Sequence, residues 1–160
     1  MPYRILNICL GNICRSPGAE AVIRSKANAA GLDIEVDSAG TSTYHLDEPP
    51  HLQSIQAGAR RGYTVAGRGR QLQQADFRTF DLIVTMDDAN LENVRQSAPS
   101  DATSIIAPLM EFAGGGQVPD PWGKPDSAYD HMYDLIEEAV DGLIAALADQ
   151  SSGLRQNKTN

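Results

Sequence analysis

The sequence predicts an α/β fold, a three-layer sandwich in which helices cover both faces of a central four-stranded parallel sheet. Three observations favour this fold. Four short apolar segments are bounded like buried strands, helical segments separate them along the chain, and 160 residues suit one domain with an ordinary core. In such sheets, ligands bind at the carboxyl ends of the strands, where the strand order switches.

The four expected strands are short runs rich in β-branched and other apolar residues. Gly11 follows the first strand, and Gly40 lies in the segment that ends the second strand. The expected strands are Tyr3–Cys9, Asp33–Ser38, Asp81–Met86 and Thr103–Ala107.

Each expected helix has a recognisable start or an apolar face. Pro17 suits a first helical turn because its missing N–H has no partner there, and Asp87 and Asp88 suit the cap of a later helix. The expected helices are Pro17–Ala30, about 51–61, 88–96 and Ser127–Ala148. We therefore assign one domain to residues 1–150 and a polar tail, expected to be disordered, to residues 151–160.

The composition disfavours several classes of function. A net charge of −8 argues against broad binding to nucleic acids or to anionic membranes. The apolar stretch 5–10 is too short for the core of a signal peptide, and no apolar run reaches the roughly 18 residues of a membrane span. Two cysteines within one motif do not form a secreted disulfide framework. We expect a soluble, cytoplasmic protein that is a monomer.

The most informative segment is Cys9-Leu10-Gly11-Asn12-Ile13-Cys14-Arg15-Ser16-Pro17, which follows an apolar strand and begins a helix. Backbone N–H groups from Leu10 to Arg15 can curl around one centre and form a nest for an anion. Gly11 and Asn12 tolerate the tight curvature that this requires. The positive end of the helix and the planar fork of Arg15 favour binding of phosphate oxygens.

The same positive charges act on the Cys9 thiol. A helix N-terminus and a nearby guanidinium favour the thiolate form of a cysteine. We therefore expect Cys9 to attack phosphorus and to form a phosphocysteine. Ser16 is close enough in sequence to donate a hydrogen bond to the sulfur, which helps when the thiolate leaves. The loop thus indicates phosphoryl transfer through cysteine.

A second segment, Val118-Pro119-Asp120-Pro121-Trp122, supplies a candidate proton donor. A bound phosphate dianion favours a protonated Asp120 carboxyl, which then acts first as general acid and later as general base for water. Trp122 is expected to form an apolar wall for an aromatic leaving group. Taken alone, Asp120 before a proline is common turn chemistry, and Trp122 is an ordinary half-buried aromatic residue.

These segments resemble the low-molecular-weight protein tyrosine phosphatase family over nearly the whole domain, roughly residues 3–148. Besides the loop after Cys9 and the segment at Asp120, the resemblance covers Asp37–Thr41 and parts of 77–90. It implies hydrolysis of phosphotyrosine on protein substrates, with no cofactor and no metal. Because bacterial members are often paired with tyrosine kinases, a bacterial tyrosine kinase is an expected partner.

The resemblance assigns roles to the matching residues. It implies that Cys9 is the nucleophile, Arg15 the phosphate clamp and Asp120 the general acid and base. Tyr44 matches an aromatic position on the rim of the site, facing Trp122. The substrate-binding residues that it implies are Leu10, Gly11, Asn12, Ile13, Cys14, Ser16, Tyr44 and Trp122.

Three further residues have implied supporting roles. Asn12 and Ser38 are expected to brace the loop by hydrogen bonds. Cys14 matches a second loop cysteine of the family, which forms a reversible disulfide with the nucleophile and spares it from over-oxidation. Cys14 is equally well described as a small buried apolar residue, and the two descriptions are compatible.

The chain departs from the family pattern at two places. Many members have a glycine and an Asp-Pro-Arg where this chain has Asp47 and His51-Leu52-Gln53, a change that affects the rim of the site and its partner preference. A histidine often found shortly before the Arg70-Gln71 pair is replaced near Gly67, which affects the bracing of the loop.

Two other functions are open from the sequence. A thiol-dependent arsenate reductase shares this fold and loop, but its usual disulfide relay needs cysteines elsewhere, and here only Cys9 and Cys14 exist. A non-catalytic phosphotyrosine-binding module is the other alternative, although the presence of Cys9, Arg15 and Asp120 together argues against it. The three scattered histidines and the cysteines have no zinc-binding spacing, so we expect no metal.

Overall fold

The computed structural model describes residues 1–155 and contains one four-stranded parallel sheet. The strands lie in the order β2-β1-β3-β4, so the first strand is at the centre. Their bounds are β1 Tyr3–Cys9, β2 Ile34–Gly40, β3 Leu82–Thr85 and β4 Ile105–Pro108. All three pairings are parallel, which confirms the predicted sheet.

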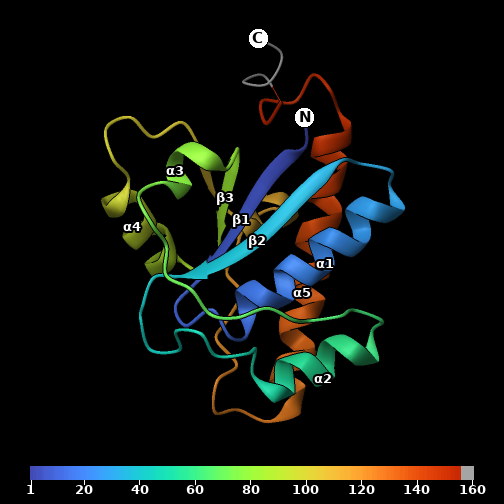
Figure 1. Ribbon diagram of the computed structural model, residues 1–160. Coiled ribbons are helices and arrows are strands. Elements are labelled where there is room, and N and C mark those ends of the chain that lie inside the picture. The colour runs from blue at the N-terminus through green and yellow to red at the C-terminus, as the bar shows by residue number, and fades with distance from the viewer. Residues whose placement is uncertain (156–160) are drawn as a thin grey trace.

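Helices cover both faces of this sheet, as the sequence predicts. Figure 1 shows α1 and α5 together on one side and α3 and α4 on the other, with α2 beside α5. The bounds are α1 Arg15–Ala29, α2 Leu52–Arg60, α3 Asp76–Thr79, α4 Asp88–Ser97 and α5 Asp126–Ala148. The three-layer sandwich is therefore confirmed.

Alternation along β1 divides the core between the two faces. Ile5 belongs to the larger cluster of buried residues, which α1 and α5 complete. Leu6 and Ile8 belong to the smaller cluster, in which they lie with Phe77 of α3 and Val94 of α4. Successive strand residues point to opposite faces, so a central strand with apolar residues on both faces indicates burial on both sides.

Two short elements escaped the sequence prediction. The helix α3 has four residues, and the 3-10 helix η1 covers Leu109–Ala113. The sequence analysis predicted no helix at either place. Neither is long enough to show an apolar periodicity. The side chain of Asp76 holds α3 by accepting a hydrogen bond from the backbone of Gln73 at 2.8 Å, a local contact that the pattern of apolar residues does not reveal.

The helix α1 begins earlier than predicted, at Arg15 instead of Pro17. Its first turn is closed by Gly18, whose backbone N–H donates to the Cys14 carbonyl at 3.3 Å. Arg15 and Ser16 therefore lie in regular helical backbone, which fixes the directions of their side chains.

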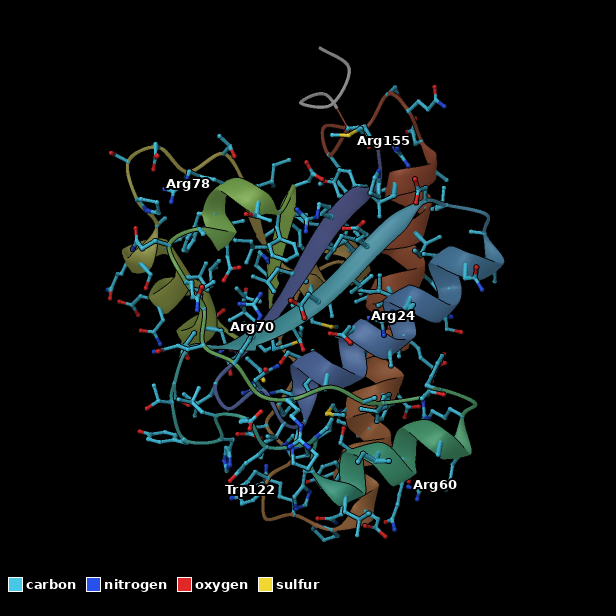
Figure 2. The ribbon with its side chains drawn as sticks, in the orientation of Figure 1. Arg24, Arg60, Arg70, Arg78, Trp122 and Arg155 are labelled. Atoms are coloured by element: carbon cyan, nitrogen blue, oxygen red, sulfur yellow. The ribbon has the colours of Figure 1, made fainter. Side chains whose placement is uncertain are left out.

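The end of the chain packs against the start of the sheet. Residues 151–155 form turns, Leu154 packs against the larger core cluster, and the Arg155 guanidinium lies 6.0 Å from the centre of the Tyr3 ring (Figure 2). The rest of the predicted tail, 156–160, lies outside the described residues. Within residues 1–155, no helix is long and apolar enough to cross a membrane.

The strand order places a crevice at the end of β1. From β1 the chain passes through α1 to β2 on one side, and it later returns to the other side of β1 as β3. Ile8 is therefore in register with Ala39 of β2 and with Thr85 of β3. Parallel sheets of this kind bind ligands at such a switch point, and Cys9 is the last residue of β1.

Candidate active site

The loop after β1 folds back onto the sulfur of Cys9. The Ser16 hydroxyl lies 3.0 Å from Cys9 Sγ, and the backbone N–H of Asn12 donates to the same sulfur at 3.2 Å. The Asn12 side-chain amide donates to Ser16 Oγ at 2.8 Å. Because Ser16 Oγ accepts from Asn12, its own hydrogen is available for the sulfur, an arrangement that suits a thiolate.

Asn12 makes hydrogen bonds on both sides of the loop. It adopts a left-handed backbone with φ of 58°, which asparagine tolerates better than most residues. Its side-chain carbonyl accepts from the backbone N–H of Arg70 at 3.0 Å, and Arg70 in turn pairs with Asp37 and Asp76 at 3.0 Å each. The segment near Gly67 therefore supports the loop through Arg70, without the histidine common in the family.

The curled backbone presents free donors to the centre of the loop. In the described part of the chain, the backbone N–H groups of Gly11, Ile13 and Cys14 have no acceptor. They adjoin the first turn of α1, whose N–H groups also lack partners within the helix. Such a concave set of donors at a helix N-terminus binds an anion.

Arg15 lies beneath the cavity and is almost fully buried, with 3% of its surface exposed. Its Nη1 donates to Asp87 Oδ2 at 2.5 Å and to the Val118 carbonyl at 3.0 Å. Its Nη2 lies 3.9 Å from Asp120 Oδ2. With Nη1 occupied, the Nε and Nη2 edge can bind two oxygens of one phosphate.

Asp87 is a site residue that the sequence analysis assigned only to a helix cap. It does cap α4: its Oδ1 accepts from the backbone of Asn90 at 2.8 Å, and the Asn90 side chain accepts from its N–H at 3.2 Å. Its second oxygen orients Arg15. The capping pattern was visible in the sequence, but the contact with Arg15 spans 72 positions and had no local signal.

The loop and two distant segments enclose a cavity of about 160 Å³. Figure 2 shows Trp122 at the end of the molecule to which the strands point, near α2. The residues that line the cavity are Cys9, Leu10, Gly11, Ile13, Cys14, Arg15, Tyr44, His45, Asp120 and Trp122. Asn12 and Ser16 do not line it, because their side chains turn behind the loop toward the sulfur and toward Arg70.

Asp120 and Trp122 lie together at the mouth of this cavity. Asp120 Oδ1 accepts from the backbone N–H of Trp122 at 3.1 Å, which forms a tight turn at Pro121. The Asp120 side chain is 45% exposed, so it is accessible to water. Tyr44 and Trp122 line the cavity, and both rings are largely exposed.

His45 lines the cavity and was missed by the sequence analysis. Its Nδ1 lies 2.5 Å from Glu48 Oε2, and its ring centre is 5.7 Å from that of Trp122. Gly11 packs against it so closely that an added Cβ would lie 3.0 Å from His45 Cδ2. The histidines are separated in the sequence, and only the path of the rim segment brings this one to the loop.

Cys14 lies on the side of the loop that faces the hydrophobic core. Its sulfur is 3.8 Å from the hydroxyl of Tyr129, whose oxygen is 3.2 Å from His51 Nδ1. Burial raises the pKa of the Cys14 thiol to about 12, more than its contact with Tyr129 lowers it. Cys14 is therefore a protonated thiol at neutral pH.

Ser38 was expected to brace the loop, and a bracing role for it stays a prediction. Its backbone N–H donates to Asp37 Oδ1 at 2.8 Å, and its side chain lies near Glu20 of α1. Ser54 of α2 contacts the loop, since its hydroxyl donates to the Cys14 carbonyl at 3.0 Å. Tyr133 supports Ser54 by donating to its carbonyl at 2.9 Å.

The two departures at the rim have visible consequences. Asp47 adopts a φ of 61°, a left-handed conformation that glycine adopts without strain. His51 lies against Trp122 with ring centres 4.8 Å apart, edge to face. Gln53 donates to Asp126 Oδ1 at 2.8 Å and so ties α2 to the start of α5.

Within residues 1–155, no three His, Cys, Asp or Glu side chains gather as potential metal ligands.

Comparison with known families decides how this site is classified. Residues 4–153 match the family described as low molecular weight phosphotyrosine protein phosphatase. The chain belongs to this family. As a member of the low-molecular-weight phosphatase family, it is an enzyme and a hydrolase.

Relatives and solved structures agree over nearly the whole chain. A low molecular weight protein-tyrosine-phosphatase of Streptomyces coelicolor is 37% identical over 161 residues, which cover 96% of this chain and 98% of that protein. A protein tyrosine phosphatase of Entamoeba histolytica, crystallised with Hepes in its active site, is 32% identical with a TM-score of 0.88, covering 92% of this chain and 97% of that one. Wzb of Vibrio vulnificus, in complex with benzylphosphonate, is 28% identical with a TM-score of 0.82, covering 89% and 97%.

Proposed function

We propose that the enzyme hydrolyses phosphotyrosine and other aryl phosphates through a phosphocysteine, with Cys9 as nucleophile, Arg15 as phosphate clamp and Asp120 as general acid and base. One observation carries the proposal. The Cys9 sulfur, the Arg15 guanidinium and the Asp120 carboxyl line the same cavity of about 160 Å³, and two aromatic rings stand at its mouth.

Binding begins with the phosphate dianion. The free N–H groups of Gly11, Ile13 and Cys14 and the open edge of Arg15 replace the water that the dianion loses. These donors are fixed before the substrate arrives, because the loop is braced through Asn12 and the guanidinium through Asp87. A preorganised set of donors also stabilises the charge of the transition state.

Transfer to cysteine needs a nucleophile and a proton for the leaving oxygen. The Cys9 thiolate forms a bond to phosphorus while the bond to the aryl oxygen breaks. Asp120, in the same cavity, gives its proton to that oxygen, so the phenol leaves as a neutral product. The electron pair of the broken bond stays on the phenol oxygen.

Hydrolysis of the phosphocysteine reverses these roles. Asp120, now a carboxylate, accepts a proton from a water molecule as the water attacks phosphorus. The bond between sulfur and phosphorus breaks, and the sulfur leaves as a thiolate. The Ser16 hydroxyl, 3.0 Å from the sulfur, stabilises that charge.

The shape of the mouth supports an aryl substrate. Leu10, Ile13, Tyr44 and Trp122 make the walls above the loop largely apolar, which suits an aromatic ring more than a short polar serine side chain. The relative Wzb binds benzylphosphonate, in which an aromatic ring is attached to a phosphonate through one carbon.

The two alternative functions fit the site less well. An arsenate reductase of this kind needs a chain of thiols, and the whole sequence contains only Cys9 and Cys14. A binding module has no use for a general acid, yet the Asp120 carboxyl lies 3.9 Å from the phosphate clamp. Arsenate reduction with glutathione or thioredoxin as reductant would favour the first, and tight phosphopeptide binding without phosphate release the second.

The activity is tested by phosphate release from a phosphotyrosine peptide in excess EDTA. We expect full activity of the wild type under these conditions, and a loss of more than about 10⁴-fold in Cys9→Ser, because serine is a poor nucleophile without a base. Cys14→Ser, which changes the other loop cysteine, should retain measurable release. Unchanged release in Cys9→Ser would exclude the mechanism.

The role of Asp120 is tested by comparing leaving groups in Asp120→Asn. Turnover of phenyl phosphate should fall by about 100-fold or more, because phenolate leaves poorly without a proton. Turnover of p-nitrophenyl phosphate should fall by about tenfold or less, because nitrophenolate is a stable leaving group. Equal losses for the two substrates would contradict a proton-donor role and would indicate a role in positioning.

We also propose that Cys14 protects Cys9 from irreversible oxidation. A hydroperoxide transfers one oxygen atom to the Cys9 thiolate and gives a sulfenic acid. The Cys14 sulfur then attacks the Cys9 sulfur: the disulfide bond forms, the bond to oxygen breaks, and the oxygen leaves as water with the proton from Cys14. A dithiol later reduces the disulfide. Both sulfurs border the same cavity, which supports the pairing.

This protection is tested by treating the enzyme with hydrogen peroxide and then with dithiothreitol. Wild type should recover most of its own initial activity, and Cys14→Ser much less, since its sulfenic acid oxidises further. Closure needs a Cys14 thiolate, and because the pKa of Cys14 is about 12, its rate should rise by about tenfold per pH unit between neutral and alkaline pH. Equal recovery in both proteins would contradict the proposal.

A further inference from the structure

A second hollow of about 540 Å³ adjoins the active-site cavity. The two share Ile13, His45 and Trp122 as lining residues, so they are neighbouring compartments divided by these side chains. The floor of the second hollow is formed by residues of the segment before α2 and of the first turn of α2. Those residues are Pro49, Pro50, Leu52 and Ile55.

The floor of this groove is apolar and open to solvent. Leu52 is 62% exposed and Trp122 is 52% exposed, although both have large apolar side chains. Contiguous exposed apolar surface of this kind marks a binding region more often than a structural one. The acidic side chain at its edge, Glu48, lies 2.5 Å from His45 Nδ1.

Contacts within the protein hold the floor and the far wall of the groove in place. The backbone N–H of His51 donates to the Ile13 carbonyl at 2.8 Å, which joins the floor to the phosphate-binding loop. Pro49 and Pro50 restrict the backbone before it. On the far wall, Trp122 lies edge to face against His51, with ring centres 4.8 Å apart. A ligand therefore gains contact area without the cost of ordering the site.

We propose that this groove is a specificity subsite that takes one apolar side chain flanking the phosphotyrosine of a peptide substrate. The inference rests on the proposed function, since the phosphotyrosine ring occupies the adjoining cavity. An extended peptide advances about 3.3 Å per residue. Because the cavity and the groove share Ile13, His45 and Trp122, a side chain within three positions of the phosphotyrosine can reach past Trp122 into the groove. The floor favours leucine or another branched apolar residue over a charged one.

The subsite lies in the stretch where this chain departs from its family. His51 and Leu52 stand where many members have the aspartate and the proline of Asp-Pro-Arg, and here they form the wall and the floor. A carboxylate in place of His51 would add a negative charge to the groove. The substrate preference of this chain is therefore expected to differ from that of such members in one feature, the flanking apolar residue.

The test uses phosphotyrosine peptides with an alanine background and a single leucine, aspartate or lysine at each of three positions on either side. For each peptide, kcat/KM is measured in wild type and in Leu52→Ser. The matched control is Leu46→Ser, because Leu46 is 50% exposed but does not line the groove. Phenyl phosphate, which has no flanking residue, is assayed in parallel with wild type.

At one of these positions, we expect the kcat/KM of wild type to be about tenfold higher with leucine than with alanine. Burial of most of the leucine side chain contributes a free energy of that size. The preference should shrink to about twofold in Leu52→Ser and persist in Leu46→Ser. A flat profile, or a preference that Leu52→Ser leaves unchanged, overturns the subsite while phenyl phosphate hydrolysis leaves the proposed function intact. A dimer that Leu52→Ser dissociates, together with a flat profile, would show that a second copy fills the groove. Absence of release from every substrate, phenyl phosphate included, would overturn the proposed function and the subsite with it.

Discussion

The site depends on the burial of one guanidinium beneath the phosphate-binding loop. A charge with 3% exposure is costly to bury unless acceptors surround it. Arg15 meets this requirement through Asp87 and the Val118 carbonyl, which come from the start of α4 and from the segment leading to Asp120. The same pair of contacts therefore joins the loop after β1, the end of β3 and the acid segment into one structure.

This arrangement explains why three parts of the chain converge at the switch point of the sheet. Cys9 is placed by the end of β1, Arg15 by the first turn of α1, and Asp120 by a turn that follows the segment held at Val118. The backbone of Val118 also donates to the Met86 carbonyl at 2.8 Å, next to Asp87. Binding, attack and proton transfer are thus served by residues whose positions are set by a few shared contacts.

The sequence predicted most of what local patterns can encode. The strands, the loop with Cys9 and Arg15, and the separate segment with Asp120 can be picked out from the sequence, because an apolar run, a glycine-containing turn and a proline-bounded aspartate are contiguous signals. The family resemblance then assigned their roles, and the match over residues 4–153 confirmed the family. A cytoplasmic location, a monomeric state and a bacterial tyrosine kinase as partner stay predictions.

Tertiary contacts between distant residues were not predictable in this way. The sequence indicates that Asp87 caps a helix. The contact of its second carboxylate oxygen with Arg15 forms only in the folded chain, between residues 72 positions apart. His45 reached the cavity through the path of an irregular segment, and Ser54 of α2 donates to the Cys14 carbonyl. These residues lie in the support and at the rim of the site, and their contacts join segments that are far apart in the sequence.

The most direct test of the account is the affinity of inorganic phosphate, measured as a competitive inhibitor, in Asp87→Asn and in Asp88→Asn. Asparagine caps a helix as well as aspartate does, so both variants keep α4, and both remove one negative charge near the site. If Asp87 orients the buried Arg15, phosphate should bind at least about tenfold more weakly in Asp87→Asn and within about twofold of wild type in Asp88→Asn. If charge alone mattered, removing a carboxylate would leave phosphate binding unchanged or make it tighter in both, and that result would contradict the account.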